Sequence, residues 1–272
     1  MLDNILLEGG LASRLPKGEE IMKKVVTFVL AGFLVGSTQF SVQASTVSYA
    51  DQIVSMQPGV TAEELAEQVE ELVLSTGMSE EEIYEAMYKE IENQNEMAAL
   101  EAKQLSEEYE DYSASEDAEI QGGGGSALYI VGPSSRGDFY YTPSATAYVN
   151  HGHVGLYYSS NVIVESIYPS GVRSISANVR KVDKGAVVKS ISTTLNNKNN
   201  ATSWAYSQIG QPYSLNFANN RNTGHNGAKN CSKLIWSAFK LNGNLDLDVD
   251  KGFGVYPRDV RDAPQTQLKR KI

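Results

Sequence analysis

The chain has few of the residues that carry most protein chemistry, with one Cys and three His among 272 residues. A single Cys cannot form a disulfide within the chain or a paired-Cys zinc motif. Three His without clustered carboxylates argue against a catalytic zinc site, although His151 with His153 is where one would form. The sequence also lacks a P-loop, a dinucleotide fingerprint, a nucleic-acid module and an internal repeat. We therefore expect no metal, no organic cofactor and no nucleic-acid partner.

Long apolar runs are also missing. The run at residues 25–36 is too short for a bilayer, which takes about 20 apolar residues. It follows Met22 and two Lys and precedes Ser41-Val42-Gln43-Ala44, a layout typical of a secretory signal. We predict that residues 1–44 are a leader and signal peptide with the true start at Met22. With no Cys for lipid attachment, we expect a protein secreted to the bacterial cell envelope or outside, without a stable membrane anchor.

Charge divides the remainder into two parts. Residues 51–120 carry 21 acidic and two basic residues, a net charge of −19, whereas residues 121–272 carry 8 acidic and 17 basic residues, a net charge of +9. Residues 113–126 are rich in Gly and Ser, which is typical of a flexible linker. We predict an acidic helical arm at 45–112, a linker at 113–126 and a basic domain at 127–272.

The arm carries two helix-start patterns. Thr61 and Glu64 form a capping box ahead of apolar residues at helical spacing. Ser79 and Glu82 form a second one, and Gly77 breaks the chain between them. Two interpretations stay open, a solvated acidic spacer and a helical hairpin docked on the chain's own basic domain.

The basic domain has the composition of an α+β fold, with short runs of Val, Ile, Tyr and Thr broken by Gly, Pro and Asn. We expect strands at 128–131, 138–141, 153–158, 162–167 and 186–191. We expect helices at about 201–209 and 231–241, and a loop at the Asn-rich residues 196–200.

Cys231 is either an inert core residue or a nucleophile, because an unpaired thiol in an exported protein must be buried or used. Asn230 is a good N-cap, which places Cys231 in the first turn of a helix, where free N–H groups and the macrodipole favour the thiolate. Cys231 is also in phase with Leu234 and Ile235, so it could belong to the buried stripe.

His153 is the candidate base. If residues 153–158 and 162–167 form a hairpin in which Tyr157 pairs with Asn161, His153 lies opposite Glu165 and shares its face. Glu165 would then orient the imidazole toward Cys231. His151 is the reserve base, and His225 lies in a polar loop.

Several segments together resemble a known family. Residues 152–157 resemble the His strand of NlpC-type cell-wall peptidases, residues 137–138 the strand start before it, and residues 230–235 the nucleophile helix. Residues 209–213 and 257–260 are similar to the segments on either side of that helix. The His strand comes before the Cys helix, an order that resembles the circularly permuted YiiX-like branch of this papain-like superfamily.

The resemblance implies an antiparallel sheet packed on helices in a permuted papain-like core, with Cys231 as nucleophile, His153 as base and Glu165 as the orienting residue. It implies a weaker substrate-binding or oxyanion role for Tyr213 and Asn230. Asn230 stands where many members have an acidic residue or Tyr. The expected function is cleavage of amide bonds in peptidoglycan stem peptides or related small peptides. The alternatives are a lipid acyltransferase or thioesterase of the same superfamily, and a non-catalytic envelope-binding or interaction protein.

Overall fold

The computed structural model describes residues 47–115, 128–144 and 151–272, with side chains described only up to residue 107 in the last helix of the arm. The predicted signal peptide and most of the predicted linker therefore lie outside the described residues. Within these ranges, no helix is both long enough and apolar enough to cross a membrane.

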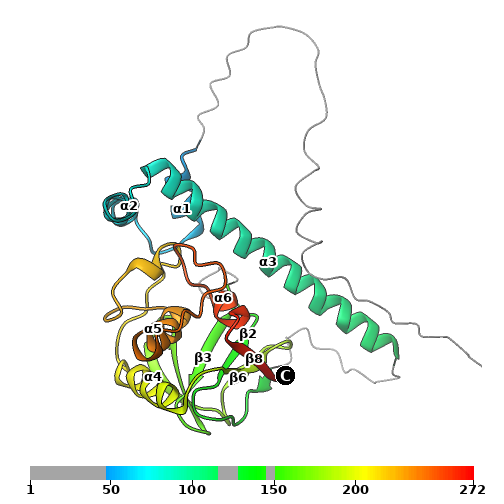
Figure 1. Ribbon diagram of the computed structural model, residues 1–272. Coiled ribbons are helices and arrows are strands. Elements are labelled where there is room, and N and C mark those ends of the chain that lie inside the picture. Colours follow the sequence, from blue (N-terminus) through cyan, green and yellow to red (C-terminus); the bar gives the residue numbers. More distant parts are fainter. Residues whose placement is uncertain (1–46, 116–127, 145–150) are drawn as a thin grey trace, which may run out of the picture. The chain divides into compact units, whose positions relative to one another are not determined.

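A six-stranded antiparallel sheet forms the centre of residues 128–272 (Figure 1). Its strand order is β5-β4-β3-β2-β7-β8, so the two hairpins β3–β4 and β4–β5 continue the sheet on one side of β2. Its strands are β2 (Phe139–Thr142), β3 (His153–Tyr157), β4 (Val162–Ile167), β5 (Gly171–Ser176), β7 (Val187–Ile191) and β8 (Thr266–Lys271). Strands β1 (Tyr129–Ile130) and β6 (Lys181–Val182) pair separately.

Both faces of the sheet are buried, because its central strands carry apolar residues in continuous runs. One face packs on α4 (Leu195–Ser207) and α5 (Cys231–Gly243), with Val154 and Leu156 contributing to that core. The other face holds a smaller core around Tyr140, Tyr157 and Ile163. The chain is therefore an α+β protein with an antiparallel sheet and helices, as its composition predicts.

The arm consists of α1 (Tyr49–Met56), α2 (Ala62–Thr76) and α3 (Glu80–Ser115). Both predicted capping boxes are confirmed, since Thr61 Oγ1 accepts from the N–H of Glu64 and Ser79 Oγ accepts from that of Glu82. Gly77 ends α2 in the left-handed conformation, as expected of a C-cap. Apolar side chains of all three helices share one core with Phe217, Ala218 and Tyr256 of the C-terminal part.

Several predicted boundaries were wrong. The Asn-rich residues 196–200 are helical rather than a loop, because Thr194 caps α4 at Leu195 by accepting from the N–H of Asn197. α3 continues to Ser115, three residues into the range predicted as linker, since no Gly or Pro interrupts it. Helix α1, strands β5, β6 and β8, and the short helices η1 (Asn220–Asn222) and α6 (Pro257–Asp262) were not predicted.

Candidate active site

Cys231 is the first residue of α5 and is 1% exposed. The helix starts here because the side-chain oxygen of Asn230 accepts a hydrogen bond from the N–H of Lys233, at 2.9 Å. The N–H groups of Cys231 and Ser232 have no acceptor in the first helical turn. The sulfur thus lies at the end of a helix where a negative charge is favoured.

His153 and Glu165 lie together on adjacent strands, although the predicted strand register was wrong. Tyr157 pairs with Ile163 and not with Asn161, so the hairpin is shifted by two residues from the predicted pairing. A shift of two keeps every side chain on its face, since the side-chain period of a strand is two. Nε2 of His153 therefore still reaches Oε2 of Glu165, at 2.9 Å. Because a carboxylate can only accept, Nε2 is the donor and Nδ1 is left for another contact.

Glu165 is a fully buried carboxylate with several donors around it. Arg173 Nη2 donates to Oε1 at 2.8 Å, and Arg180 Nε and Tyr140 Oη donate to Oε2 at 2.9 and 2.5 Å. Burial by itself raises the pKa of Glu165, but the bonds and charges of His153 and Arg180 and the bond from Tyr140 outweigh it and hold it well below its usual range. Glu165 is therefore ionised near neutral pH.

His153 contacts both Glu165 and Cys231. Burial disfavours the imidazolium, yet the hydrogen bonds and charges of Cys231 and Glu165 outweigh burial and raise the pKa of His153 to about 9. His153 is therefore protonated near pH 7 when the sulfur beside it is ionised. The three residues form a Cys–His–Glu series in which each member contacts the next.

A cavity of about 360 Å³ reaches His153. Its polar lining includes Thr142, Ser144, Arg180, Lys181 and Asp183, and its apolar lining includes Ile167 and Tyr168. A substrate in this cavity would meet His153 and the cation of Lys181, whereas Arg180 is paired with Glu165 and Cys231 is not among the lining residues.

Tyr213 does not line the cavity that reaches His153. It lines a neighbouring cavity of about 470 Å³, together with Gly59 and Gln68 of the arm. Tyr168 lines both cavities, and its ring lies edge-on to Tyr213 with 5.9 Å between centroids. This arrangement gives no support for a direct oxyanion contact from Tyr213. A substrate-binding role for Tyr213 remains a prediction.

Asn230 is fully buried, and its side chain is occupied by structural contacts. Besides capping α5, its amide oxygen contacts Asn220 Nδ2 and Ser232 Oγ, each at 3.2 Å, and its Nδ2 donates to the carbonyl of Asn216. These contacts fix the start of α5 and the loop before it. The side chain positions Cys231 but is not available to a substrate.

The other two histidines lie elsewhere. His151 is buried against the rings of Phe217 and Tyr256, with centroids at 4.5 and 5.1 Å, and burial next to Arg258 lowers its pKa to about 3. His225 stacks on Trp236 and contacts Ser237 Oγ at 2.9 Å. The choice of His153 over His151 as the candidate base agrees with this placement.

The sequence did not indicate the donors around Glu165. Tyr140, Arg173 and Arg180 come from β2, β5 and the turn after β5, and two of these elements follow the hairpin that was predicted. The sequence offered one indication, that a buried carboxylate needs positively charged partners. Sequence alone cannot say which residues those partners are. Among the described residues, one group of carboxylates could hold a metal ion, Glu90 with Asp250 and Asp259. It includes no member of the Cys–His–Glu series.

The fold and the site define an α+β protein in which a Cys at the start of a helix meets a His–Glu pair on an antiparallel sheet. No protein-family model matches the chain. The chain is 39% identical over 249 residues to the uncharacterized protein YycO of Bacillus subtilis strain 168, and the match covers 91% of this chain and 97% of YycO. The chain therefore belongs to the YycO family.

Among solved structures, the chain is similar to the crystal structure of the metalloprotein YiiX from Escherichia coli O157:H7. That similarity has a TM-score of 0.39 and 14% identity, and it covers 51% of this chain and 97% of the YiiX chain. The papain-like core and the cysteine-peptidase chemistry stay predictions.

Proposed function

We propose that this protein is a secreted thiol hydrolase that transfers an acyl group through Cys231. The observation that supports the proposal is the series of contacts from Glu165 through His153 to Cys231 at the start of α5. A nucleophile, a base and a group that orients the base are the parts that covalent catalysis needs. The buried ionised Glu165 accepts from Nε2 of His153 and so leaves Nδ1 of the ring for the contact with Cys231.

In the proposed reaction, Sγ of Cys231 forms a bond to the carbonyl carbon of an amide, and the carbonyl electron pair moves to oxygen. When the C–N bond breaks, His153 gives its proton to the leaving amine, and a thioester remains on Cys231. A water then attacks the thioester while His153 takes up its proton. The C–S bond breaks, and the carboxylic acid product leaves.

The start of α5 supplies the natural donors for the oxyanion. The N–H groups of Cys231 and Ser232 have no helical acceptor, and the side chain of Asn230 uses its cap oxygen on Lys233. Fixed backbone donors at a helix start stabilise the charge that develops on the carbonyl oxygen. Asn230 thus contributes by holding the turn.

The substrate class we propose is a peptidoglycan stem peptide or a related small peptide in the bacterial cell envelope. Lys181 lines the cavity at His153, and its ammonium group suits the carboxylates that such peptides carry. A lipid or thioester acyl donor would pass through the same acyl-enzyme. The test therefore offers both kinds of substrate.

The deciding experiment incubates the purified protein with peptidoglycan, free stem peptides and acyl lipids, and follows products by mass spectrometry. We expect amide cleavage that is lost in Cys231→Ala and in His153→Ala, since nucleophile and base act as a unit. His225→Ala is the matched control, because it removes an imidazole from the same part of the chain and should keep activity. Release of acyl groups from the lipids, with no cleavage of the peptides, would favour the alternative of a lipid acyltransferase or thioesterase.

A non-catalytic binding protein is the second candidate, because Cys231 is packed among core residues such as Val154 and Leu234. As the chain has one Cys, a thiol reagent reports on that residue alone. We expect labelling of the native protein at neutral pH, slowed in His153→Ala. Labelling only after denaturation, together with no turnover of any substrate, would favour the binding protein.

A further inference from the structure

Three carboxylates from separate segments converge beside the arm. Glu90 belongs to α3, Asp250 to the loop between α5 and α6, and Asp259 to the first turn of α6. One oxygen of each lies within 4.8 Å of the others. Glu90 and Asp259 are buried and Asp250 is exposed, so the group has one side open to solvent.

The loop is shaped to receive the Glu90 carboxylate. Backbone N–H groups of Phe253 and Gly254 donate to its two oxygens at 2.9 and 3.0 Å. A Cβ at Gly252 would come within 2.4 Å of Glu90 Oε2, and one at Gly254 within 3.0 Å of Oε1. The carboxylate occupies a cradle that only Gly at these positions leaves open.

Two buried polar atoms without a partner within the described ranges belong to side chains that lie beside the same group. Gln94 lies one helical turn after Glu90 on α3, so the two side chains share a face. Its Nε2 donates to Asp259 Oδ1 at 2.9 Å, while its Oε1 is fully buried and has no hydrogen-bond partner among the described residues. The Tyr256 hydroxyl, beside the same carboxylates, is also buried without a partner in the described part of the chain.

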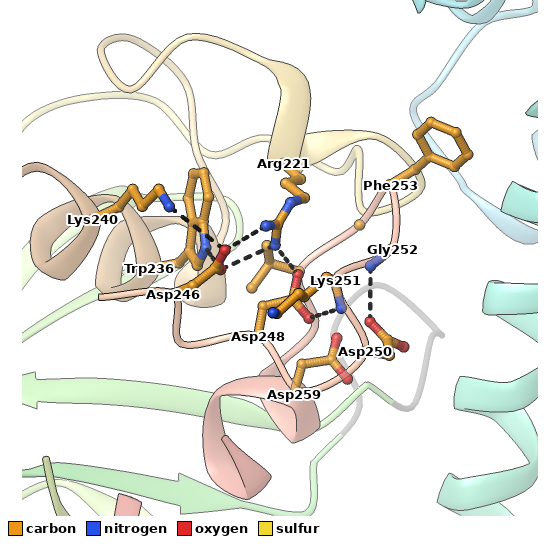
Figure 2. A network of polar contacts seen from close by, with 12 residues as sticks. Arg221, Trp236, Lys240, Asp246, Asp248, Asp250, Lys251, Gly252, Phe253 and Asp259 are labelled. Carbon is orange, nitrogen blue, oxygen red and sulfur yellow. Dashed lines mark hydrogen bonds and ion pairs between the residues drawn. The ribbon is translucent and has the colours of Figure 1, made fainter. Parts of the chain in front are cut away.

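The loop that carries Asp250 is held in place from its other side. Arg221 pairs with Asp246 and Asp248, and Asp248 Oδ1 accepts from the N–H of Lys251 (Figure 2). These contacts set the backbone of the loop. Asp250 accepts from the N–H of Gly252 and shares a side-chain hydrogen bond with Asp248, so the lone pairs that these two bonds do not use can bind an ion.

The spacing of the oxygens indicates the kind of ion. Oxygens bound to one Ca²⁺ at 2.3–2.6 Å can be at most about 4.6–5.2 Å apart, whereas Mg²⁺ at 2.0–2.1 Å allows about 4.2 Å. The three oxygens lie within 4.8 Å of one another, which Ca²⁺ accommodates over that whole range with its longer bonds and flexible geometry. Without a cation, burial and the neighbouring carboxylates raise the pKa of Glu90 to about 9 and that of Asp259 to about 8, so a bound proton is the competing state.

We propose that Glu90, Asp250 and Asp259, with Gln94 Oε1 as a neutral ligand, form a Ca²⁺ site that ties α3 to the C-terminal part. A cavity of about 470 Å³ gives the ion a path and room for waters; Glu90, Asn93 and Asp250 line it, as do the cations Lys89, Arg221 and Lys251. The site is separate from Cys231 and His153. Its role is to fix the arm, and it does not depend on the proposed hydrolase activity.

The test removes metal from the purified protein with a chelator and adds CaCl2 or MgCl2, measuring heat of binding and the midpoint of thermal unfolding. We expect one Ca²⁺ per chain, a rise in the midpoint and weaker binding of Mg²⁺. Asp250→Asn should weaken Ca²⁺ binding by about tenfold or more. Glu96→Gln removes another exposed carboxylate of α3 and is the matched control that should bind Ca²⁺ normally.

Hydrogen exchange of residues 80–100, with and without Ca²⁺, tests the link to the arm. Slower exchange with Ca²⁺, absent in Asp250→Asn, supports the proposal. No heat of binding, or equal binding in Asp250→Asn, would overturn the site and leave a carboxyl pair that holds a proton. Binding without any change in exchange would overturn the role in fixing α3.

Discussion

The strongest electrostatic feature at the level of single residues is the ionised Glu165 beneath His153. Isolated in a protein interior, such a carboxylate would take up a proton, and here two Arg, a Tyr and a His prevent it. The same contact stabilises the protonated form of the His153 imidazole. Glu165 is one of the groups that raise the pKa of His153 to about 9.

Glu165→Gln should therefore change the pH profile and not only the rate. Without the carboxylate, the pKa of His153 falls from about 9, so the imidazolium that protonates the leaving group is lost at lower pH. We expect the alkaline limb of kcat/KM to move toward neutral pH, with a reduced maximum. The measurement is kcat/KM between pH 5 and 10 for both proteins. An alkaline limb at the same pH in Glu165→Gln would contradict the assigned contact.

The folded protein should also lose stability in alkaline solution. Because the folded pKa of His153 is above the unfolded value of about 6.5, its contribution is fully present below pH 6.5 and is lost as pH rises through about 9. Urea unfolding at pH 6 and pH 9.5 should show this loss. His153→Gln should reduce the difference between the two pH values, and an unchanged difference would assign the loss to other groups.

At the residue level, the sequence leaves few candidates for a nucleophile and a base. With one Cys and three His, the nucleophile and base candidates were few, and Cys231 and His153 do contact each other. The predicted register was wrong by two residues, because the paired positions are joined by residues 158–162 and not by the shorter loop 158–160, and loop length fixes hairpin register. The sequence could not predict the ion pairs of Arg173 and Arg180 with Glu165, since such long-range pairs leave no local sequence pattern.

At the level of elements, α5 depends on its N-cap. Asn230 is buried and uses both ends of its amide, so its loss removes the cap and leaves the carbonyl of Asn216 short of a donor. We expect Asn230→Ala to lower the free energy of unfolding by about 2 kcal/mol. Thr194→Ala, at the more exposed cap of α4, should cost about 1 kcal/mol. Equal losses in urea unfolding would show that the buried contacts of Asn230 add nothing to the cap.

Elements with a strong local signal were predicted, and those without one were missed. Strand β4 matched its prediction because it opens with the β-branched run Val162-Ile163-Val164 and is bounded by turn residues. Strand β8, Thr266–Lys271, is rich in cations and forms an edge of the sheet, where exposure permits charge. Its pairing with β7 stabilises it, and nothing within the segment predicts a strand.

At the scale of the whole molecule, charge and apolar burial act together between the arm and the C-terminal part. The opposite net charges of the two parts suggested an electrostatic contact that salt would weaken. The structure adds a shared apolar core with Phe217 and Tyr256, which salt does not screen. A chain that starts at Gly122 would expose both rings. We therefore expect the arm to stay docked in 1 M NaCl. A larger hydrodynamic radius in gel filtration, or faster proteolysis of the arm, at that salt would contradict this.

Glu101 should account for much of the charged part of this contact. Its carboxylate pairs with Arg258 at 2.8 Å and with Arg261 at 2.5 Å, and it accepts from the Tyr141 hydroxyl at 2.6 Å. Arg258 is 1% exposed at its side chain, so removing the carboxylate leaves a buried cation with less compensation. We expect Glu101→Gln to lower the free energy of unfolding by about 2–3 kcal/mol.

Glu107→Gln is the matched control for this substitution, because Glu107 lies on the same helix and pairs with Lys103 in solvent, where an ion pair contributes little. Each variant removes one negative charge from the parent chain, so both change the net charge of the protein equally. Urea unfolding at 0.1 M and 1 M NaCl gives both free energies. Since the Glu101 pairs are mostly shielded from solvent, their loss should persist at 1 M NaCl. A deficit in Glu101→Gln that disappears at high salt would mean that these ion pairs act as surface charges and that the apolar core alone holds the arm.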